Sequence, residues 1–343
     1  MARTPTSTPM TAALGLSVDE VGEVLERASL APSVHNSQPW RFLVRAEQIE
    51  LHADHHFPAI GLARRELRLS CGAALMNMRL ALQHFGIRPM VTLFPGSAAP
   101  GALAVVRHGG FTEPTSETDA LLRAVPRRRT NVRPFGRSPV PESARLLLVR
   151  AAAQERGWLH VVSDREERAW LCELIKRADR LQQADPVHQA ELAAWTGCRE
   201  GNDGVAPEPA RRSRPRPEDE WVLRDFAPGE KDAQQPFESD PFIVVVCSFY
   251  DDQVAELRAG QALQGVLLYA ATAGLSATFI PQPVQVPSVR DDLRRLLGGT
   301  LIPHIVLRIG YGSPVPATPR RPVRELLLEP EPLTRSAHRV SSR

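Results

Sequence analysis

The residues between Ala31 and Trp40 carry many hydrogen-bonding side chains within a few positions of a 343-residue chain. The run reads Ala-Pro-Ser-Val-His-Asn-Ser-Gln-Pro-Trp, and Pro32 and Pro39 bracket its polar residues. Each proline fixes φ and removes a backbone donor, so the run does not suit a helix or strand interior. A polar loop held between elements is a common place to grip a ligand. We expect a binding loop here, and a proline-rich connection without a ligand is the alternative.

One arginine-rich run could bind a phosphate group, because guanidinium groups bind phosphate bidentately and a hydroxyl adds a donor. The run spans residues 127–135, Arg-Arg-Arg-Thr-Asn-Val-Arg-Pro-Phe. Its candidate ligands are Arg128, Arg129, Thr130 and Arg133. Taken alone, the run is better explained as a solvated basic turn, so the phosphate interpretation depends on what the rest of the chain shows.

The loop resembles the Ser-x-x-Asn-x-Gln-Pro-Trp signature of the flavin-dependent nitroreductase family. The matching residues are Ser33, Asn36, Gln38, Pro39 and Trp40. The resemblance implies FMN as cofactor, with the loop against its ring and ribityl chain. It makes these loop residues candidate cofactor contacts: Pro32, Ser33, Asn36 and Gln38. The basic run resembles the family's Arg-Arg-Ser-x-Arg phosphate motif, with threonine for serine and one residue inserted before the last arginine.

Two later segments also resemble this family. Residues 310–326 resemble its closing Gly-Tyr-Pro and Arg-Arg-Pro segment, which implies a second phosphate contact from Arg320 or Arg321, with a solvated charge pair as the alternative. Residues 278–284 resemble the loop whose backbone donors meet the flavin N5 edge. Pro281 and Gln282 are the candidate contacts there, and of these two only Gln282 has a backbone N–H to donate. No catalytic acid–base residue is expected, because reduced flavin delivers hydride itself and the protein positions the ring.

The elements that must position these residues alternate between helices and strands. Apolar periodicity and capping signals predict helices over residues 18–30, 69–85, 117–124, 142–154, 165–184, 257–273 and 289–297. Strands are predicted over residues 41–44, 49–53, 90–94, 103–107, 158–163, 242–248 and 304–309. The pattern predicts an α+β protein with mainly antiparallel sheets packed on helices.

An internal repeat is indicated by two long helices, residues 71–86 and 259–274. Both start with a glycine near the beginning, carry alanine and leucine along their length and end at a glycine. Any two buried helices could share these features, which is the alternative. Nitroreductases are typically homodimers, so the resemblance implies two fused pseudo-dimeric halves, as in the single-chain Acg-type branch of actinobacteria. The halves would span residues 17–113 and 114–330, with at most one FMN per chain.

Three segments fall outside this repeat. Residues 1–16 and 331–343 are expected to be tails, the first of them disordered. Residues 195–235 are rich in proline, glycine and charge, and a run this long inside a domain is often functional. In Acg-type proteins the matching segment acts as a lid over the flavin, and a surface insertion without a role is the alternative.

Composition excludes several classes of function. The net charge of +3 and the 6% aromatic content argue against a nucleic-acid partner. No run reaches the roughly 18 apolar residues of a membrane helix. Four scattered cysteines without CxxC spacing fit a reducing cytoplasm, and His52, His55 and His56 lack the cysteines or carboxylates of a tetrahedral metal site.

The resemblance implies an FMN-dependent oxidoreductase that passes electrons from NAD(P)H, a transient donor, to a nitroaromatic, quinone or similar small acceptor. An FMN storage or sequestration protein without turnover is the alternative, and a degenerate relative that binds no flavin is a third hypothesis. We expect a monomer with an internal pseudo-dimer, for which further association stays open.

Overall fold

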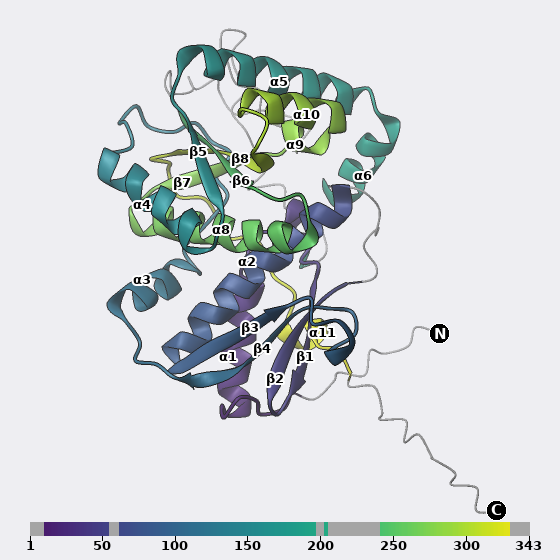
Figure 1. Cartoon of the computed structure of the whole chain (residues 1–343), viewed down its shortest axis with the longest axis vertical. Helices are drawn as coiled ribbons and strands as arrows, with labels where there is room; N and C mark the ends of the chain where they lie inside the picture. The colour runs from purple at the N-terminus through teal and green to yellow at the C-terminus, as the bar shows by residue number, and fades with distance from the viewer. Residues whose placement is uncertain (1–9, 55–61, 197–201, 205–240, 330–343) are drawn as a thin grey trace, which may run out of the picture.

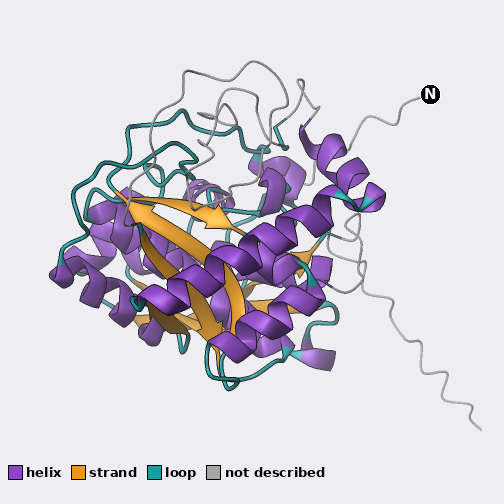
Figure 2. Cartoon of the chain, turned by 90° about the horizontal axis from the view of Figure 1, so that it is seen from above, coloured by secondary structure: helices purple, strands orange, loops and turns teal. Residues whose placement is uncertain are grey.

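The computed structural model describes residues 10–54, 62–196, 202–204 and 241–329. Two four-stranded antiparallel sheets lie in separate lobes, and the long helices α2 (Leu62–His84) and α8 (Gln253–Thr272) lie between them (Figure 1). In the view of Figure 2, helices lie in front of the strands and beside them. The architecture is α+β with two halves.

The first sheet is built from strands β1 (Trp40–Arg45), β2 (Gln48–Ala53), β3 (Ile87–Leu93) and β4 (Ala102–Phe111), in the order β1-β2-β4-β3. Helix α1 (Val18–Ser29) precedes it and begins with a capping box between Ser17 and Glu20. Two short 3₁₀ turns, η1 (Val34–Asn36) and η2 (Gly96–Ala98), complete this half.

The second sheet repeats this order as β5-β6-β8-β7. Its strands are β5 (Trp158–Val162), β6 (Phe242–Ser248), β7 (Ser276–Ile280) and β8 (Ile302–Gly310). The other helices are α3 (Ser116–Ala124), α4 (Glu142–Gln154), α5 (Arg165–Gln183), α6 (Pro186–Thr196), α9 (Gln282–Gln285), α10 (Pro287–Leu296) and α11 (Val323–Leu326), of which α11 packs against α1 and β1 of the first half. In each half the long helix follows the second strand, so the two halves share one topology.

The long helices cross at two glycines. A Cβ on Gly72 would lie 2.1 Å from the carbonyl oxygen of Leu257, and a Cβ on Gly260 would lie 2.1 Å from that of Leu69. The contact is reciprocal, because the two pairs have the same spacing along their helices. Only residues without side chains allow backbones to approach this closely.

The end of the chain returns to the first lobe. The backbone N–H of Leu328 donates to the carbonyl of Phe42 at 2.8 Å, and Leu327 forms a parallel bridge with Phe42 in β1. The segment that follows β8 therefore crosses from the second lobe to the first and passes the loop after α1 on its way.

Two expectations about the elements need correction. Residues 10–16 are not a disordered tail, because Ala13, Leu14 and Leu16 are buried and the N–H of Leu14 donates to the carbonyl of Ala46. Residues 278–284 are not a loop, because they contain the end of β7 and most of α9, where the N–H of Val284 donates to Pro281. Helix α6 was also missed.

Other expectations lie partly beyond the described residues. Of residues 195–235, Trp195 and Thr196 belong to α6 and residues 202–204 are described, while the others lie outside. His52 contacts Glu50 at 2.9 Å, whereas His55 and His56 fall in an undescribed range. Within the described ranges no helix is long and apolar enough to cross a membrane.

Candidate functional site

A cavity of about 220 Å³ opens between the two halves and takes its walls from both. The loop after α1 and the first turns of α2 supply one wall, and residues around Arg128, Phe279 and His304 supply the other. It is lined by eight of the twelve residues predicted from sequence: Pro32, Ser33, Asn36, Arg128, Arg129, Thr130, Pro281 and Arg320. Residues that are far apart in the sequence thus meet at one place.

The loop after α1 has a strained backbone. His35, Asn36 and Gln38 all have positive φ, at 51°, 55° and 49°, a region that residues other than glycine seldom adopt. Such strain persists only where the surroundings fix it and is concentrated at functional sites. The Ser33 hydroxyl accepts a hydrogen bond from the N–H of Gln38 at 3.0 Å, which closes the loop on itself.

Asn36 and Gln38 hold the C-terminal segment against this loop. The Asn36 side chain donates to the carbonyl of Pro319 at 3.1 Å and accepts from Arg320 at 2.7 Å. Gln38, fully buried, accepts from the backbone N–H of Arg321 at 2.8 Å. In this structure the motif's two amides therefore bind protein groups of the second half.

Arg128 is the least satisfied charged group of the cavity. Its side chain is 6% exposed, and its Nε and Nη1 have no hydrogen-bond partner among the described residues. Burial, together with the charges of Arg320 and Arg129, lowers the pKa of Arg128 to about 9. A buried guanidinium without partners is costly, so this arrangement favours an anion that satisfies it.

Arg320 lies beside Arg128 and is held by backbone carbonyls. It donates to the carbonyl oxygens of Ser29 at 3.0 Å and Ala31 at 3.2 Å, and to the Thr318 hydroxyl at 2.7 Å. Burial and the charge of Arg129 lower the pKa of Arg320 to about 10. The helix-end carbonyls orient the guanidinium without neutralising it.

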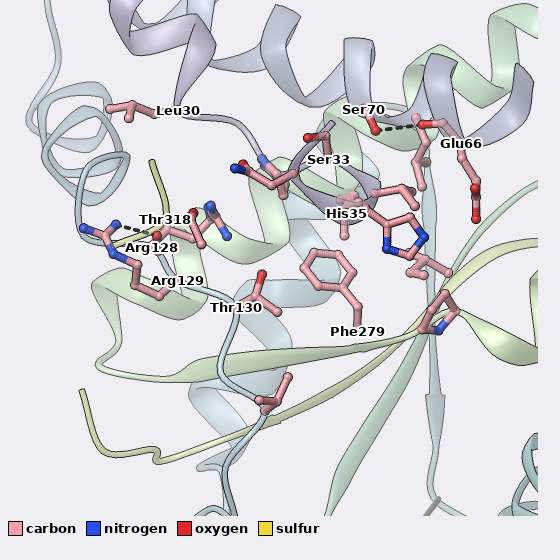
Figure 3. Close-up of a pocket in the computed structure, with 18 of the residues that line it drawn as sticks. Leu30, Ser33, His35, Glu66, Ser70, Arg128, Arg129, Thr130, Phe279 and Thr318 are labelled. Carbon is pink, nitrogen blue, oxygen red and sulfur yellow. Dashed lines mark hydrogen bonds between the residues drawn. The ribbon is translucent and has the colours of Figure 1, made fainter. Parts of the chain in front are cut away.

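The three arginines form a cationic end of the cavity. None of Arg128, Arg129 and Arg320 makes an ion pair with a described residue, and the Arg129 guanidinium donates to the carbonyl of Arg128 at 2.8 Å. Figure 3 shows Arg128, Arg129 and Thr318 on one side of the cavity. Glu66, Ser70 and His35 lie on the other side.

Strand β7 holds in place the run that contains Arg128 and Arg129. Thr130 forms a parallel bridge with Ala277, and the N–H of Asn131 donates to the carbonyl of Ala277 at 2.9 Å. The Thr278 hydroxyl donates to the carbonyl of Asn131. The basic run is therefore bound to the edge of a strand and is not a freely solvated turn.

The other four predicted residues do not line the cavity. Gln38 and Arg321 lie next to it, and Arg321 pairs with Asp203 through Nε at 3.0 Å. The backbone of Arg133 accepts from buried Arg308 at 2.7 Å. Gln282 is fully buried, and its side-chain oxygen and nitrogen find no partner among the described residues.

Several lining residues were missed by the sequence reasoning. Glu66, Ser70, Phe279, His304 and Thr318 line the cavity, as does His35, which lies within the loop that was singled out. Glu66 and Ser70 occur four residues apart on α2, a spacing that places both on one face of a helix. That spacing could have shown their shared face, but nothing in it indicates that the face meets the cavity.

These features define a two-halved α+β protein with a shared cavity, one end of which carries Arg128, Arg129 and Arg320. No family model matches the chain. It is 33% identical over 328 residues to a Mycobacterium tuberculosis H37Rv protein provisionally named NAD(P)H nitroreductase Rv3131, covering 92% of this chain and 93% of that protein. It is 30% identical over 319 residues to the M. tuberculosis H37Rv protein provisionally named NAD(P)H nitroreductase acg, covering 91% and 96%.

The chain therefore belongs to the nitroreductase family, in the branch that includes Acg. Among solved structures, it is similar to a nitroreductase with bound FMN from Bacteroides fragilis. That match has a TM-score of 0.35 and 18% identity, and it covers 56% of this chain and 88% of the other. The family assignment rests on the two mycobacterial relatives.

Proposed function

We propose that this protein is an FMN-dependent oxidoreductase that passes electrons from NAD(P)H to a nitroaromatic, a quinone or a similar small acceptor. The observation that carries the proposal is buried Arg128, which lines the cavity with Arg129 and Arg320 and makes no ion pair with a described residue. A dianionic phosphate bound here would offset the three charges.

The residues present fit FMN at both ends of the cavity. Arg128, Arg129 and Arg320, with the Thr130 hydroxyl, would hold the phosphate. Beyond them the walls are largely apolar, with Leu69, Phe279 and Val284 among the lining side chains. A flat aromatic ring suits such walls, since binding sites are mostly apolar with a few placed polar groups.

When bound, FMN would supply the hydride chemistry, so the chain's own residues have other tasks. They bind the phosphate, enclose the ring and limit access to it. The cavity combines the loop of the first half with the arginines of the second, which supports one FMN per chain. The shared strand order and the reciprocal Gly72–Gly260 contact support two fused pseudo-dimeric halves.

An anaerobic visible spectrum of the purified protein with FMN tests this function. We expect flavin to bind, to bleach when NADH or NADPH is added, and to recover when a nitroaromatic or quinone follows. Colourless protein that takes up no FMN would contradict cofactor binding. Binding of much more than one FMN per chain would contradict the shared site.

Storage of FMN without turnover is a second candidate, and residues 202–204 favour it. Gln38 donates to the carbonyl of Asn202 at 2.7 Å, Asp203 pairs with Arg321, and buried Gly204 lines the cavity. This segment lies against the cavity and could keep substrates from the flavin, as a lid would. Bound flavin that stays oxidised with either nicotinamide, yet bleaches with dithionite, would favour storage.

A further inference from the structure

His304 and Ser248 form a hydrogen-bonded pair whose proton positions follow from the geometry. Ser248 Oγ lies 2.7 Å from His304 Nε2 and 2.7 Å from the carbonyl oxygen of Tyr250. A hydroxyl has one hydrogen and a carbonyl can only accept, so the hydroxyl donates to Tyr250. Nε2 must then carry the ring hydrogen and donate to Oγ, which leaves Nδ1 with a free lone pair.

The ring is held in this neutral form. Burial lowers the pKa of His304 to about 3, and the charges of Arg65 on α2 and Arg290 on α10 lower it further than Asp251 raises it. Arg65 and Arg290 both pair with Asp251, at 3.1 and 3.4 Å, which fixes their charges near the ring. At neutral pH, Nδ1 is therefore an acceptor.

The cavity is where this acceptor can be used. His304 lines it and is 8% exposed, and its only hydrogen bond among the described residues is the one from Nε2. Nδ1 makes no hydrogen bond to a described residue and is not one of the fully enclosed polar atoms, so part of its surface is accessible. The carboxylate of Glu66, which also lines the cavity, already accepts from Gln285 and is therefore less available.

His304 and Arg128 line the same cavity but are influenced by different charged groups. The charges that act on His304 are those of Arg65, Arg290 and Asp251, whereas Arg320 and Arg129 act on Arg128. Arg65 precedes Glu66, which lies across the cavity from Arg128 and Arg129 in Figure 3. A ligand with its phosphate at the arginines would extend its other end toward His304.

We propose that His304 accepts a hydrogen bond from the N3–H group of the flavin ring and so orients the ring in the cavity, an inference that rests on the proposed function. The ring edge of oxidised FMN presents acceptors at N1, O2, O4 and N5 and a single donor at N3. A lone pair in the cavity wall matches N3–H and repels the other four. His304 is thus a positioning residue for the cofactor, with Ser248 fixing its tautomer.

The test uses FMN labelled with ¹⁵N at N3, bound to the oxidised full-length protein. In the wild type we expect a slowly exchanging N3 proton, shifted downfield by the hydrogen bond. His304→Leu should still bind FMN but lose this resonance, whereas His304→Gln, which keeps an acceptor, should restore it in part. An unchanged resonance in His304→Leu would overturn the proposal.

Glu66→Leu is the matched control, because Glu66 is another side-chain acceptor that lines the cavity and leucine, unlike glutamine, keeps no acceptor. It should leave the N3 resonance in place, and its loss in that variant alone would assign the contact to Glu66 and overturn ours. If His304→Leu does not fold, N3-methyl FMN tests the wild type directly. We expect it to bind roughly 5-fold or more weakly than FMN, the effect of about one hydrogen bond.

Equal affinity for FMN and N3-methyl FMN would overturn the assignment while leaving the proposed function intact. Failure of the wild type to bind unmodified FMN would instead overturn the proposed function and this inference with it.

Discussion

Gly72 of α2 and Gly260 of α8 are in direct backbone contact where the two halves of the molecule meet. A Cβ on either glycine would lie 2.9 Å from the other's Cα and 2.1 Å from a carbonyl oxygen of the facing helix. Helices this close can only be adjusted by moving whole backbones, so the crossing fixes how the two lobes sit. The cavity, whose walls come from both lobes, depends on it.

Gly72→Ala and Gly260→Ala should each lower the free energy of unfolding by about 1–3 kcal/mol, because the added methyl overpacks a backbone contact. Gly265→Ala on the same α8 is the matched control, since its Cβ would meet nothing nearer than 3.5 Å. That substitution should be neutral or stabilising by up to about 1 kcal/mol. Urea unfolding measures all three, and equal effects would contradict the assigned contact.

Arg128→Met should weaken FMN binding roughly 10-fold or more, because a charged hydrogen bond contributes about 1.5–3 kcal/mol. Without FMN or phosphate, the same variant should be more stable than the wild type by about 1–3 kcal/mol, because a buried unpaired charge is removed. Exposed Arg127, replaced by Met, should change neither quantity much. Thermal unfolding and FMN titration together test this, and a destabilised ligand-free Arg128→Met would contradict it.

Asp203→Asn should speed the release of bound FMN by about 5-fold, because it removes the charge that pairs with Arg321 and holds residues 202–204 near the cavity. Stopped-flow fluorescence of released flavin measures the rate. Asp119→Asn is the control. It removes an exposed pair with His84, which lies at the opposite end of α2 from the cavity-lining Glu66, so the release rate should not change. Identical release rates in all three proteins would contradict a role for this segment in retaining flavin.

Stability should fall as pH drops below about 6.5, in part through His304. Its folded pKa is lowered to about 3 by burial, so between these values the unfolded chain binds a proton that the folded protein does not. The slope from one such group reaches about 1.4 kcal/mol per pH unit. In urea unfolding from pH 7.5 to pH 4.5, His304→Gln should show a shallower slope than the wild type, and an equal slope would contradict the assignment.

The sequence alone determined the local features of this protein. Capping residues and apolar periodicity predicted α1, and β-branched residues predicted the fully buried strand β6. The composition of the Ala31–Trp40 run marked the loop that lines the cavity, and the arginine runs marked its cationic end. These signals were available because each depends on residues that are close together in the chain.

Only the tertiary structure decided which of these groups meet and what each one does. Asn36 and Gln38 carry the motif, yet they bind Arg320 and Arg321 from the far end of the chain. In the sequence His304 is one residue of a predicted strand, and only in the folded structure does Ser248 lie close enough to fix its tautomer. The physical reason is that burial and partnership set a side chain's charge and hydrogen bonding, and packing between distant segments sets both.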